Sequence, residues 1–359
     1  MKILVAMSGG VDSSVVAHLL ARDGHELIGV QFHLWSDPLA PPLAQLLPSK
    51  CCNAQTVARA KKVADDLGIP LQRIDLSDEF KAAVVDPFLE SYKNGLTPNP
   101  CIGCNRSIKF GKLLSLAEEL GCDALATGHY ARIAFDESAA RFLLLEAVDA
   151  TKDQSYYLYG LSQEQLSRIL FPLGSMEKTD VFKLAAEFHV PLPEYYSESQ
   201  DLCFFPEKEP HDFLDRYIDP NPGDIVDATG KKHGTHRGIH HFTEGQRKGL
   251  NIGGLKIPLH VVRKDISANR IIVGSKEESM RSACSASDLR WVSWVPSQGT
   301  EHTFDARIHS LGNRVRGQMV HDGTTLRFQF ERPLLGVSPG QSLVLYRSEE
   351  IVGGGVIAV

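Results

Sequence analysis

The sequence predicts an α/β domain built on a parallel sheet, followed by a smaller, β-rich central domain and a C-terminal β-barrel. Strand-like and helix-like segments alternate over the first 200 residues, which is typical of a parallel sheet with helices on both faces. A glycine-rich turn follows the first strand. After about Phe205 helical periodicity fades, and short β-rich runs with Gly and Pro take over. We therefore expect three domains, over residues 1–205, 206–275 and 276–359.

The elements follow from apolar periodicity and from turn residues. The apolar run 3–7 predicts a short buried strand, and residues 15–20 predict the helix after it. Further strands are expected over 26–32, 71–74 and 124–127, and further helices over 53–67, 79–92, 108–120, 163–170 and 177–188. The proline-rich stretch 37–50 predicts a surface loop. In the C-terminal part, 261–273 predicts a hairpin and 291–359 predicts the short strands of a barrel.

Composition limits the classes of protein. The chain has 359 residues with 43% hydrophobic content, which is enough for a soluble core. It contains no apolar run long enough to span a membrane, and its apolar start is too short for a signal peptide, so we expect a cytoplasmic protein without a membrane partner. The net charge of −6 disfavours a general polyanion binder. Residues 231–264, however, hold eight Lys or Arg against one Glu, an excess that could steer a nucleic acid or simply cover a solvated face.

The segment Ser8-Gly9-Gly10-Val11-Asp12-Ser13-Ser14 joins the first strand to the first helix. A glycine turn that enters a helix N-terminus directs backbone N–H groups and the positive end of the helix dipole at an anion. No lysine follows the glycines, so the segment is not the P-loop of nucleoside triphosphatases. An ordinary strand–turn–helix joint is the alternative. We favour a phosphate cradle, and Gly128 is expected beside it at the same carboxyl edge of the sheet.

Seven cysteines in a chain without a secretion signal argue against a disulfide framework. Cys122 and Cys284 show no partner pattern and are interpreted as buried apolar residues. Cys101 and Cys104 form a Cys-x-x-Cys pair, and we expect a helix to begin just after it, at Asn105 or Arg106, and to lower the pKa of the Cys104 thiol.

Three interpretations of the pair compete. A structural zinc site would need two more ligands, such as the adjacent Cys51 and Cys52, which are poorly suited to a tetrahedral site. A thioredoxin-like couple would need its own small fold, which is absent from the pattern. A reactive pair next to an ATP-binding loop suits sulfur transfer, and we favour it.

Taken together, these motifs resemble those of the tRNA-specific 2-thiouridylases over essentially the whole chain. The matching stretches are 8–14, 97–105, 126–130, 152–156, 201–204, 245–250 and 339–341. The first stretch alone resembles the wider ATP pyrophosphatase superfamily, whose members cleave ATP between its α and β phosphorus atoms. The resemblance implies a parallel sheet of the adenine-nucleotide α-hydrolase (PP-loop) type.

The activity that the resemblance implies is ATP-dependent 2-thiolation of the wobble uridine of tRNA. The uracil 2-carbonyl would be adenylated and sulfur would come from a cysteine persulfide. The implied cofactors are ATP and Mg²⁺, which Asp12 would help to place. The implied partners are tRNA, with the target base extruded from its stack, and a persulfide sulfur donor protein; we expect a monomer.

The resemblance also assigns residues. Cys203 matches the persulfide carrier, and Cys104 matches the partner thiol that can form a disulfide with it. The matching nucleotide-binding residues are Ala6, Met7, Ser8, Gly9, Gly10, Val11, Asp12, Ser13, Phe32 and Gly128. The matching tRNA-contacting residues are Asn99, Pro100, Cys101, His129, Lys152, Asp153, Gln154, Arg314, Val315 and Gln341. Several of these have a plain structural alternative: a turn for Gly128, a buried histidine for His129, a solvated lysine for Lys152 and a hairpin residue for Gln341.

Three positions depart from the family pattern. Cys101 stands where some members have an acid, Phe32 replaces the commoner methionine, and Val315 stands where an aromatic residue is frequent, which argues against base stacking there. Three thiols also allow a second hypothesis, in which Cys101, Cys104 and Cys203 ligate an iron–sulfur cluster.

Three other functions compete with this one. An ATP pyrophosphatase-type ligase acting on a small molecule would use the Ser8 loop but leave the thiols without a task. An RNA-binding scaffold would leave the Asp12 loop unused, and so would a metal-binding regulator built on the Cys-x-x-Cys pair.

Overall fold

The computed structural model describes residues 1–41, 53–191, 202–207, 209–253 and 257–358. Of the segments singled out in the sequence, Cys51, Cys52 and residues 199–201 lie outside this described part. Among the described residues, no helix has both the length and the apolar character needed to cross a bilayer.

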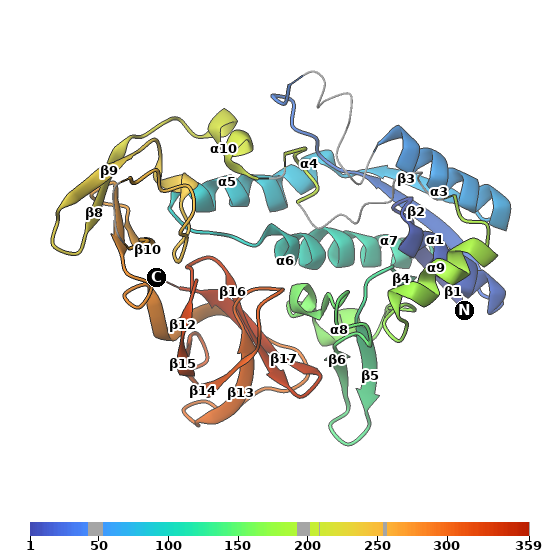
Figure 1. Cartoon of the computed structure of the whole chain (residues 1–359). Helices are drawn as coiled ribbons and strands as arrows, with labels where there is room; N and C mark the ends of the chain where they lie inside the picture. Colours follow the sequence, from blue (N-terminus) through green and yellow to red (C-terminus); the bar gives the residue numbers. More distant parts are fainter. Residues whose placement is uncertain (42–52, 192–201, 208, 254–256, 359) are drawn as a thin grey trace.

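A five-stranded parallel sheet forms the N-terminal part, in the order β3-β2-β1-β4-β7 (Figure 1). Its strands are β1 (Lys2–Ala6), β2 (Glu26–His33), β3 (Leu71–Asp75), β4 (Ala124–Ala126) and β7 (Ile169–Leu170). Alternate residues of β1 face opposite sides of the sheet. Ile3 and Val5 pack with the helices α1 (Val11–Arg22), α3 (Ala54–Leu67) and α9 (Lys178–Glu187). Leu4 packs on the other side, with the helix that contains Phe110 and Leu113. Helices therefore cover both faces, as the alternation predicted.

The helices of this part follow the expected pattern. They are α1 (Val11–Arg22), α3 (Ala54–Leu67), α4 (Ser77–Phe80), α5 (Asp86–Lys93), α6 (Pro100–Cys104), α7 (Leu113–Glu119), α8 (Gln163–Leu166) and α9 (Lys178–Glu187). A π-helical segment, η1 (Lys81–Val85), joins α4 to α5, and another, η2 (Asn105–Lys112), joins α6 to α7. A 3₁₀ turn, η3 (Ser155–Leu158), follows the β5–β6 hairpin.

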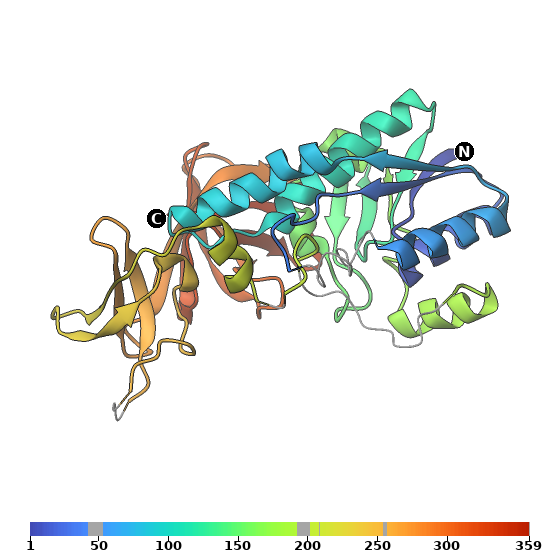
Figure 2. The same ribbon diagram turned by 90° about the horizontal axis from the view of Figure 1, so that it is seen from above.

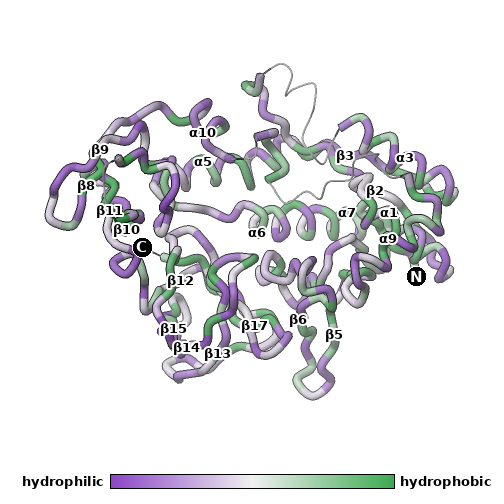
Figure 3. Tube along the Cα trace, viewed as in Figure 1, coloured by the Kyte–Doolittle hydropathy of each residue, from purple (hydrophilic) through white to green (hydrophobic). Residues whose placement is uncertain are grey.

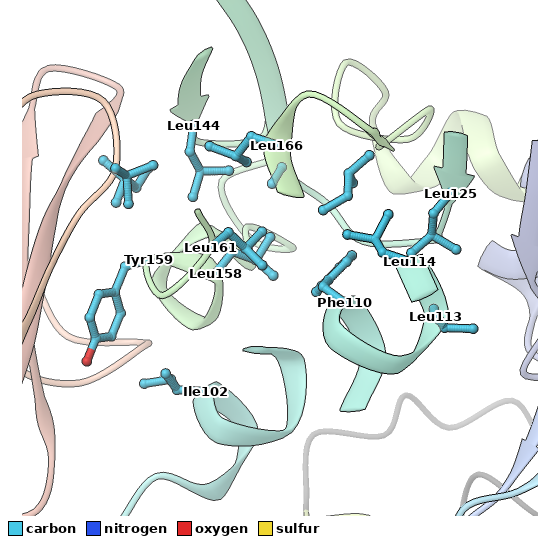
Figure 4. Packing of buried hydrophobic residues seen from close by; sticks show 14 of the residues in the cluster. Ile102, Phe110, Leu113, Leu114, Leu125, Leu144, Leu158, Tyr159, Leu161 and Leu166 are labelled. Carbon is cyan, nitrogen blue, oxygen red and sulfur yellow. The ribbon is translucent and has the colours of Figure 1, made fainter. Parts of the chain in front are cut away.

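The helix after the Cys-x-x-Cys pair begins earlier than predicted. It starts at Pro100, with Asn99 as its N-cap, rather than at Asn105 or Arg106. Proline suits the first helical position because it lacks an N–H there and its φ is already helical. Figure 4 shows the apolar side chains of this helix in the core: Ile102, Phe110, Leu113 and Leu114. The pair is therefore inside the helix, anchored by its apolar neighbours.

Two other segments differ from the prediction. The helix expected over 163–170 ends at Leu166, and Ile169–Leu170 instead form β7, which pairs with β4. Residues after the fourth strand form an unpredicted hairpin, β5 (Arg132–Asp136) and β6 (Arg141–Leu145). Glu350 of the C-terminal barrel pairs with Leu145 of this hairpin, so the hairpin connects the first and last parts of the chain.

The central part and the parallel sheet lie at opposite ends of the molecule (Figure 2). Helix α10 (His211–Tyr217) leads into a four-stranded sheet of order β10-β11-β8-β9, with a 3₁₀ turn η4 (Ile239–His241). Its strands are β8 (Gly223–Asp227), β9 (Lys232–His236), β10 (His260–Asp265) and β11 (Arg270–Gly274). The predicted hairpin over 261–273 is confirmed as β10 and β11.

The C-terminal part is a closed barrel, in which β12 pairs with both β15 and β17. Its strands are β12 (Met280–Trp291), β13 (His302–Arg307), β14 (Val315–His321), β15 (Leu326–Leu335), β16 (Ser342–Arg347) and β17 (Glu350–Ile357). Leu326, Phe328 and Phe330 are buried and alternate with exposed residues, as the sequence predicted. Hairpin loops such as β8–β9 are hydrophilic in Figure 3. The predicted fold class is thus confirmed.

Candidate functional site: a nucleotide cradle beside two thiols

The glycine loop lies at the carboxyl edge of the parallel sheet, where strand register places its predicted partners. Ala6 pairs with Val30, so Phe32 near the end of β2 lies alongside the start of the loop. Val5 pairs with Ala126, which places Gly128 beyond the end of β4. A Cβ at Gly128 would lie 3.1 Å from the Asp12 Cβ and 3.1 Å from the Ser13 backbone nitrogen. Gly128 is therefore a close packing position against the loop, in agreement with its predicted place.

Gly9 has a backbone conformation and a packing environment that only glycine fits. Its φ is +74°, and a Cβ there would lie 2.0 Å from the Thr56 carbonyl oxygen. Arg59 on α3 donates from Nε to the Gly9 carbonyl oxygen at 2.8 Å. Helix α3 thus fixes the back of the loop.

Hydroxyl groups close the loop on the other side. The Ser13 and Ser14 hydroxyls donate to the Gly10 carbonyl oxygen at 3.2 and 2.9 Å, and the Gly10 N–H donates to the Ser8 hydroxyl at 3.3 Å. Gly10 is the N-cap of α1, so helix geometry leaves the N–H groups of residues 11–13 without an intrahelical acceptor. These N–H groups and the α1 dipole form an anion cradle.

Asp12 is held by two residues from later parts of the chain. Its Oδ1 accepts from the Tyr130 hydroxyl at 2.9 Å and from Lys178 Nζ at 2.5 Å. Only 8% of the Lys178 side chain is exposed, compared with 30% of Asp12. Sequence reasoning missed Lys178. The signal was available, because a lysine at the first position of a helix opposes the helix dipole and indicates an anionic partner elsewhere.

The two predicted catalytic thiols belong to one apolar cluster. Cys104 is a member of the cluster, and 6% of its surface is exposed. Cys203, near the end of the first domain, is partly buried and packs against the same cluster. Leu34 and Leu76, which follow β2 and β3, are also members. Both thiols therefore contact a cluster that extends from the carboxyl ends of β2 and β3.

The electrostatic setting of Cys104 differs from the prediction. Cys104 is the fifth residue of its helix, beyond the first turn, where the dipole effect is concentrated. Arg106, expected near the thiol, forms an ion pair with Asp288 of the barrel at 3.2 Å. The earlier helix start removes the helix N-terminus as an activating group for Cys104.

Of the two cysteines interpreted as buried apolar residues, Cys122 is buried, whereas Cys284 is half-buried and packs against the barrel core. Burial raises the pKa of the Cys122 thiol, and it raises the pKa of Cys284 to about 12. Cys101 is half-buried. Burial raises the pKa of the nearby Tyr157 hydroxyl, and a negative charge on the Cys101 thiolate would raise it further.

A loop of the barrel contacts the segment before α6. We call α6, which contains Cys101 and Cys104, the cysteine helix. Thr97 N–H donates to the Pro339 carbonyl oxygen at 2.8 Å, and Gln341 Nε2 donates to the Thr97 carbonyl oxygen at 2.9 Å. The Thr97 hydroxyl also lies 3.4 Å from that of Thr243 in the central part. We call these contacts the Thr97 latch. All three parts of the chain meet there, two residues before Asn99.

The segment 152–154 is tied into the scaffold. Asp153 accepts from the Ala147 N–H at 3.0 Å and from the Ser155 hydroxyl at 2.8 Å. Gln154 exchanges hydrogen bonds with the Tyr130 backbone, at 3.0 and 2.8 Å. Lys152 is half-buried in the turn before them. Asp153 and Gln154 thus position the segment that supplies the Tyr130 hydroxyl to Asp12.

His129 packs between the Phe110 and Phe171 rings, and its Nδ1 lies 2.8 Å from the Thr127 hydroxyl. Burial, helped by the Lys109 charge, lowers the pKa of His129 well below its usual value. A neutral imidazole at this position cannot serve as a phosphate-binding cation near pH 7.

Arg314 and Val315 lie at the start of β14, at the edge of the barrel. The Arg314 guanidinium forms an ion pair with Glu146 and lies 4.2 Å over the Tyr346 ring. Val315 is 4% exposed and belongs to the barrel core. Their tRNA contacts stay a prediction.

Comparison with known proteins decides the family. The model described as tRNA methyl transferase HUP domain matches residues 1–207, the tRNA methyl transferase PRC-barrel domain matches 211–275, and the aminomethyltransferase beta-barrel domain matches 281–357. A tRNA-specific 2-thiouridylase MnmA of Chloroflexus aurantiacus is 43% identical over 99% of this chain and 98% of its own length. The chain belongs to the tRNA-specific 2-thiouridylase family. The 2-thiouridylase of Synechocystis is 42% identical over 99% of this chain and 96% of its own length.

A solved structure described as the U34-tRNA thiolase NcsA from Methanococcus maripaludis with its [4Fe-4S] cluster is more distant. It is 19% identical, covers 57% of this chain and 61% of its own, and has a TM-score of 0.34. That likeness carries no weight for the chemistry of this 2-thiouridylase.

Proposed function

We propose that this chain catalyses ATP-dependent 2-thiolation of the wobble uridine of tRNA, with Cys203 as persulfide carrier and Cys104 as its partner thiol. The observation that carries the proposal is that both thiols contact one apolar cluster beyond the ends of β2 and β3, the same edge of the sheet from which the Ser8 loop leaves β1, in a chain that matches 2-thiouridylases along its whole length. A ligase for small molecules would need the loop but not the thiols.

ATP would bind with its phosphates on the loop from Ala6 to Ser13 and its nucleoside near Phe32 and Gly128. The uracil 2-oxygen would attack the α-phosphorus, and pyrophosphate would leave. This step converts a carbonyl oxygen, which is a poor leaving group, into AMP, which is a good one. The cradle supports it because its N–H groups stabilise the departing negative charge.

Sulfur transfer then takes place in two displacement steps. The terminal persulfide sulfur on Cys203 would attack C2 of the adenylated base, forming a C–S bond and releasing AMP. The Cys104 thiolate would attack the Cys203 Sγ, which breaks the S–S bond to the base and leaves 2-thiouridine and a Cys104–Cys203 disulfide. An external dithiol reductant must supply two electrons to restore both thiols.

The residues around Asp12 fit a divalent cation. Oδ1 is committed to Tyr130 and Lys178, while 30% of the side chain is exposed, which leaves Oδ2 as one oxygen ligand beside the phosphates. When bound there, Mg²⁺ would neutralise phosphate charge. Lys178 would keep the Asp12 carboxylate oriented throughout.

Asn99, Pro100 and Cys101 are proposed to surround the extruded uridine, since they lie between the Thr97 latch and Cys104. His129, Lys152, Asp153, Gln154, Arg314, Val315 and Gln341 remain proposed tRNA-contacting positions. Asp153, Gln154 and Gln341 already make internal hydrogen bonds, and contacts with tRNA would be made in addition to these.

The test is a reconstituted reaction. Protein, ATP, Mg²⁺, a chemical persulfide donor and unmodified tRNA are incubated, and the digested tRNA is examined for 2-thiouridine by mass. We expect 2-thiouridine only with ATP, its loss in Cys203→Ser and Cys104→Ser, and its retention in the control Cys284→Ser. Full activity in Cys203→Ser would refute its role as persulfide carrier, and absence of 2-thiouridine from the complete reaction with the unaltered protein would refute the proposed function and favour the small-molecule ligase.

The iron–sulfur hypothesis is tested on the same preparation. Anaerobically purified protein is assayed for iron and sulfide. A metal-free enzyme that still makes 2-thiouridine excludes a cluster on Cys101, Cys104 and Cys203, whereas activity proportional to bound iron would replace the persulfide pathway.

A further inference from the structure

A cluster of imidazoles and one carboxylate lies outside the site described above, where α10 meets the central domain. The side-chain ligand atoms of Asp215, His240 and His241 all lie within 4.8 Å of one another. Both imidazoles face the same oxygen: Asp215 Oδ1 lies 2.8 Å from His241 Nε2 and 3.4 Å from His240 Nε2. Among the described residues this is the one group of three or more His, Cys, Asp or Glu with metal-binding spacing.

His211 is a candidate for a fourth ligand, although its ring nitrogens lie outside the 4.8 Å group and its side chain would have to rotate toward the ion. His211 is one helical turn before Asp215 on α10, and residues four apart share a helix face. The His211 ring centroid lies 4.9 Å from that of His241. His211 and Asp215 thus approach from the helix, and His240 and His241 approach from η4 of the central domain.

We propose that Asp215, His240 and His241, with His211 as the fourth ligand, bind a Zn²⁺ ion that fixes α10 to the central domain. Four ligand atoms about 2.1 Å from a zinc ion at tetrahedral angles lie about 3.4 Å from one another. The separation of 3.4 Å between Asp215 Oδ1 and His240 Nε2 equals this value, and the separation of 2.8 Å between Asp215 Oδ1 and His241 Nε2 is shorter, so these atoms would move apart slightly around an ion. Imidazole nitrogens with a single carboxylate oxygen suit Zn²⁺ better than Mg²⁺ or Ca²⁺, which prefer all-oxygen sites.

Burial favours a defined site over an accidental surface cluster. His240 is 4% exposed, so its ring is held in place by its surroundings and is largely shielded from water. Asp215 is exposed, which leaves an entry path for the ion. A divalent cation would satisfy all the nitrogens at once.

The position of α10 explains what the ion would do. The other face of this helix carries Phe213 and Leu214, which pack in the apolar cluster that contains Cys104 and against which Cys203 packs. Its next turn is fixed to the segment after β2, because Arg216 and Tyr217 both bind Asp37, at 2.7 and 2.5 Å. Figure 1 shows α10 between the central sheet and α5. A metal on its remaining face would hold the central domain at a fixed distance from the thiols.

The test is Co²⁺ titration of the full-length protein after chelation, followed by visible absorption. Tetrahedral Co²⁺ with nitrogen and oxygen ligands gives intense visible bands without the near-ultraviolet thiolate charge-transfer band. We expect one Co²⁺ per chain with this spectrum, displaced by Zn²⁺, and a rise in melting temperature with Zn²⁺.

The variants separate this site from the cysteines. His241→Gln and Asp215→Asn, both at the accessible side of the cluster, should lose the spectrum and the melting shift. The control His233→Gln changes a histidine of the same domain that pairs with Asp227 instead, and it should keep both. Absence of saturable Co²⁺ binding, binding unchanged in His241→Gln, or a thiolate charge-transfer band would each overturn the proposal. Thiolation activity is not the readout, so failure here would leave the proposed function unaffected.

Discussion

At the scale of single residues, Gly9 and Asp12 determine the cradle. Gly9 lets the loop pass against the Thr56 carbonyl, and Asp12 is oriented by the Tyr130 hydroxyl and Lys178. The sequence could predict the first because glycine at a strand–helix turn has a physical reason. The second was not predicted, because the partners come from segments more than a hundred positions away. Only the unusual lysine at the start of α9 pointed to that contact.

The Gly9→Ala variant separates backbone strain from packing. The new Cβ would meet the Thr56 carbonyl at 2.0 Å, and φ of +74° adds about 1–2 kcal/mol of strain. The matched control is Gly24→Ala, which has φ of +79° but no atom within 4 Å. We expect Gly9→Ala to lower the free energy of unfolding by more than the control and to weaken ATP binding at least tenfold, as measured by denaturant unfolding and calorimetry. Equal effects of the two variants would contradict the packing role of Gly9.

At the scale of elements, the Thr97 latch fixes the chain three residues before the cysteine helix begins. The barrel loop at Pro339–Gln341 holds both backbone groups of Thr97, and Pro100 starts the helix three residues later. The prediction placed that helix start too late because it did not use Pro100 as a signal for a helix start. In fact Pro100 is favoured as a first helical residue, and the apolar Ile102 continues the buried face.

Gly340→Ala should disturb this latch. Its φ is +93°, and a Cβ would lie 2.9 Å from the Thr97 nitrogen, whereas the control Gly230→Ala, with φ of +86°, has open space. Displacing reacting groups by about 1 Å can cost about 100-fold in rate, so we expect thiolation by Gly340→Ala to fall by ~10–100-fold. ATP-dependent pyrophosphate exchange should change less, since the cradle is remote from the barrel. Rates equal to those of Gly230→Ala in the tRNA assay would show that the latch does not position the cysteine helix.

At the scale of the whole molecule, the sequence predicted the order of architectures but not how they connect. Alternating segments predicted the parallel sheet, and Leu326–Phe330 alternation predicted a barrel strand. The β5–β6 hairpin and its pairing with Glu350 escaped prediction, because strand partners distant in sequence leave no local periodicity. The His211, Asp215, His240 and His241 cluster escaped for the same reason. Long-range contacts define the site, whereas local patterns define the elements.

The most direct test of the central claim is a single turnover without reductant, followed by peptide mass analysis of the protein. We expect a Cys104–Cys203 disulfide to form once for each 2-thiouridine made, only when ATP, tRNA and persulfide are all present. Formation of 2-thiouridine with both cysteines still reduced, or joined to other cysteines, would contradict it.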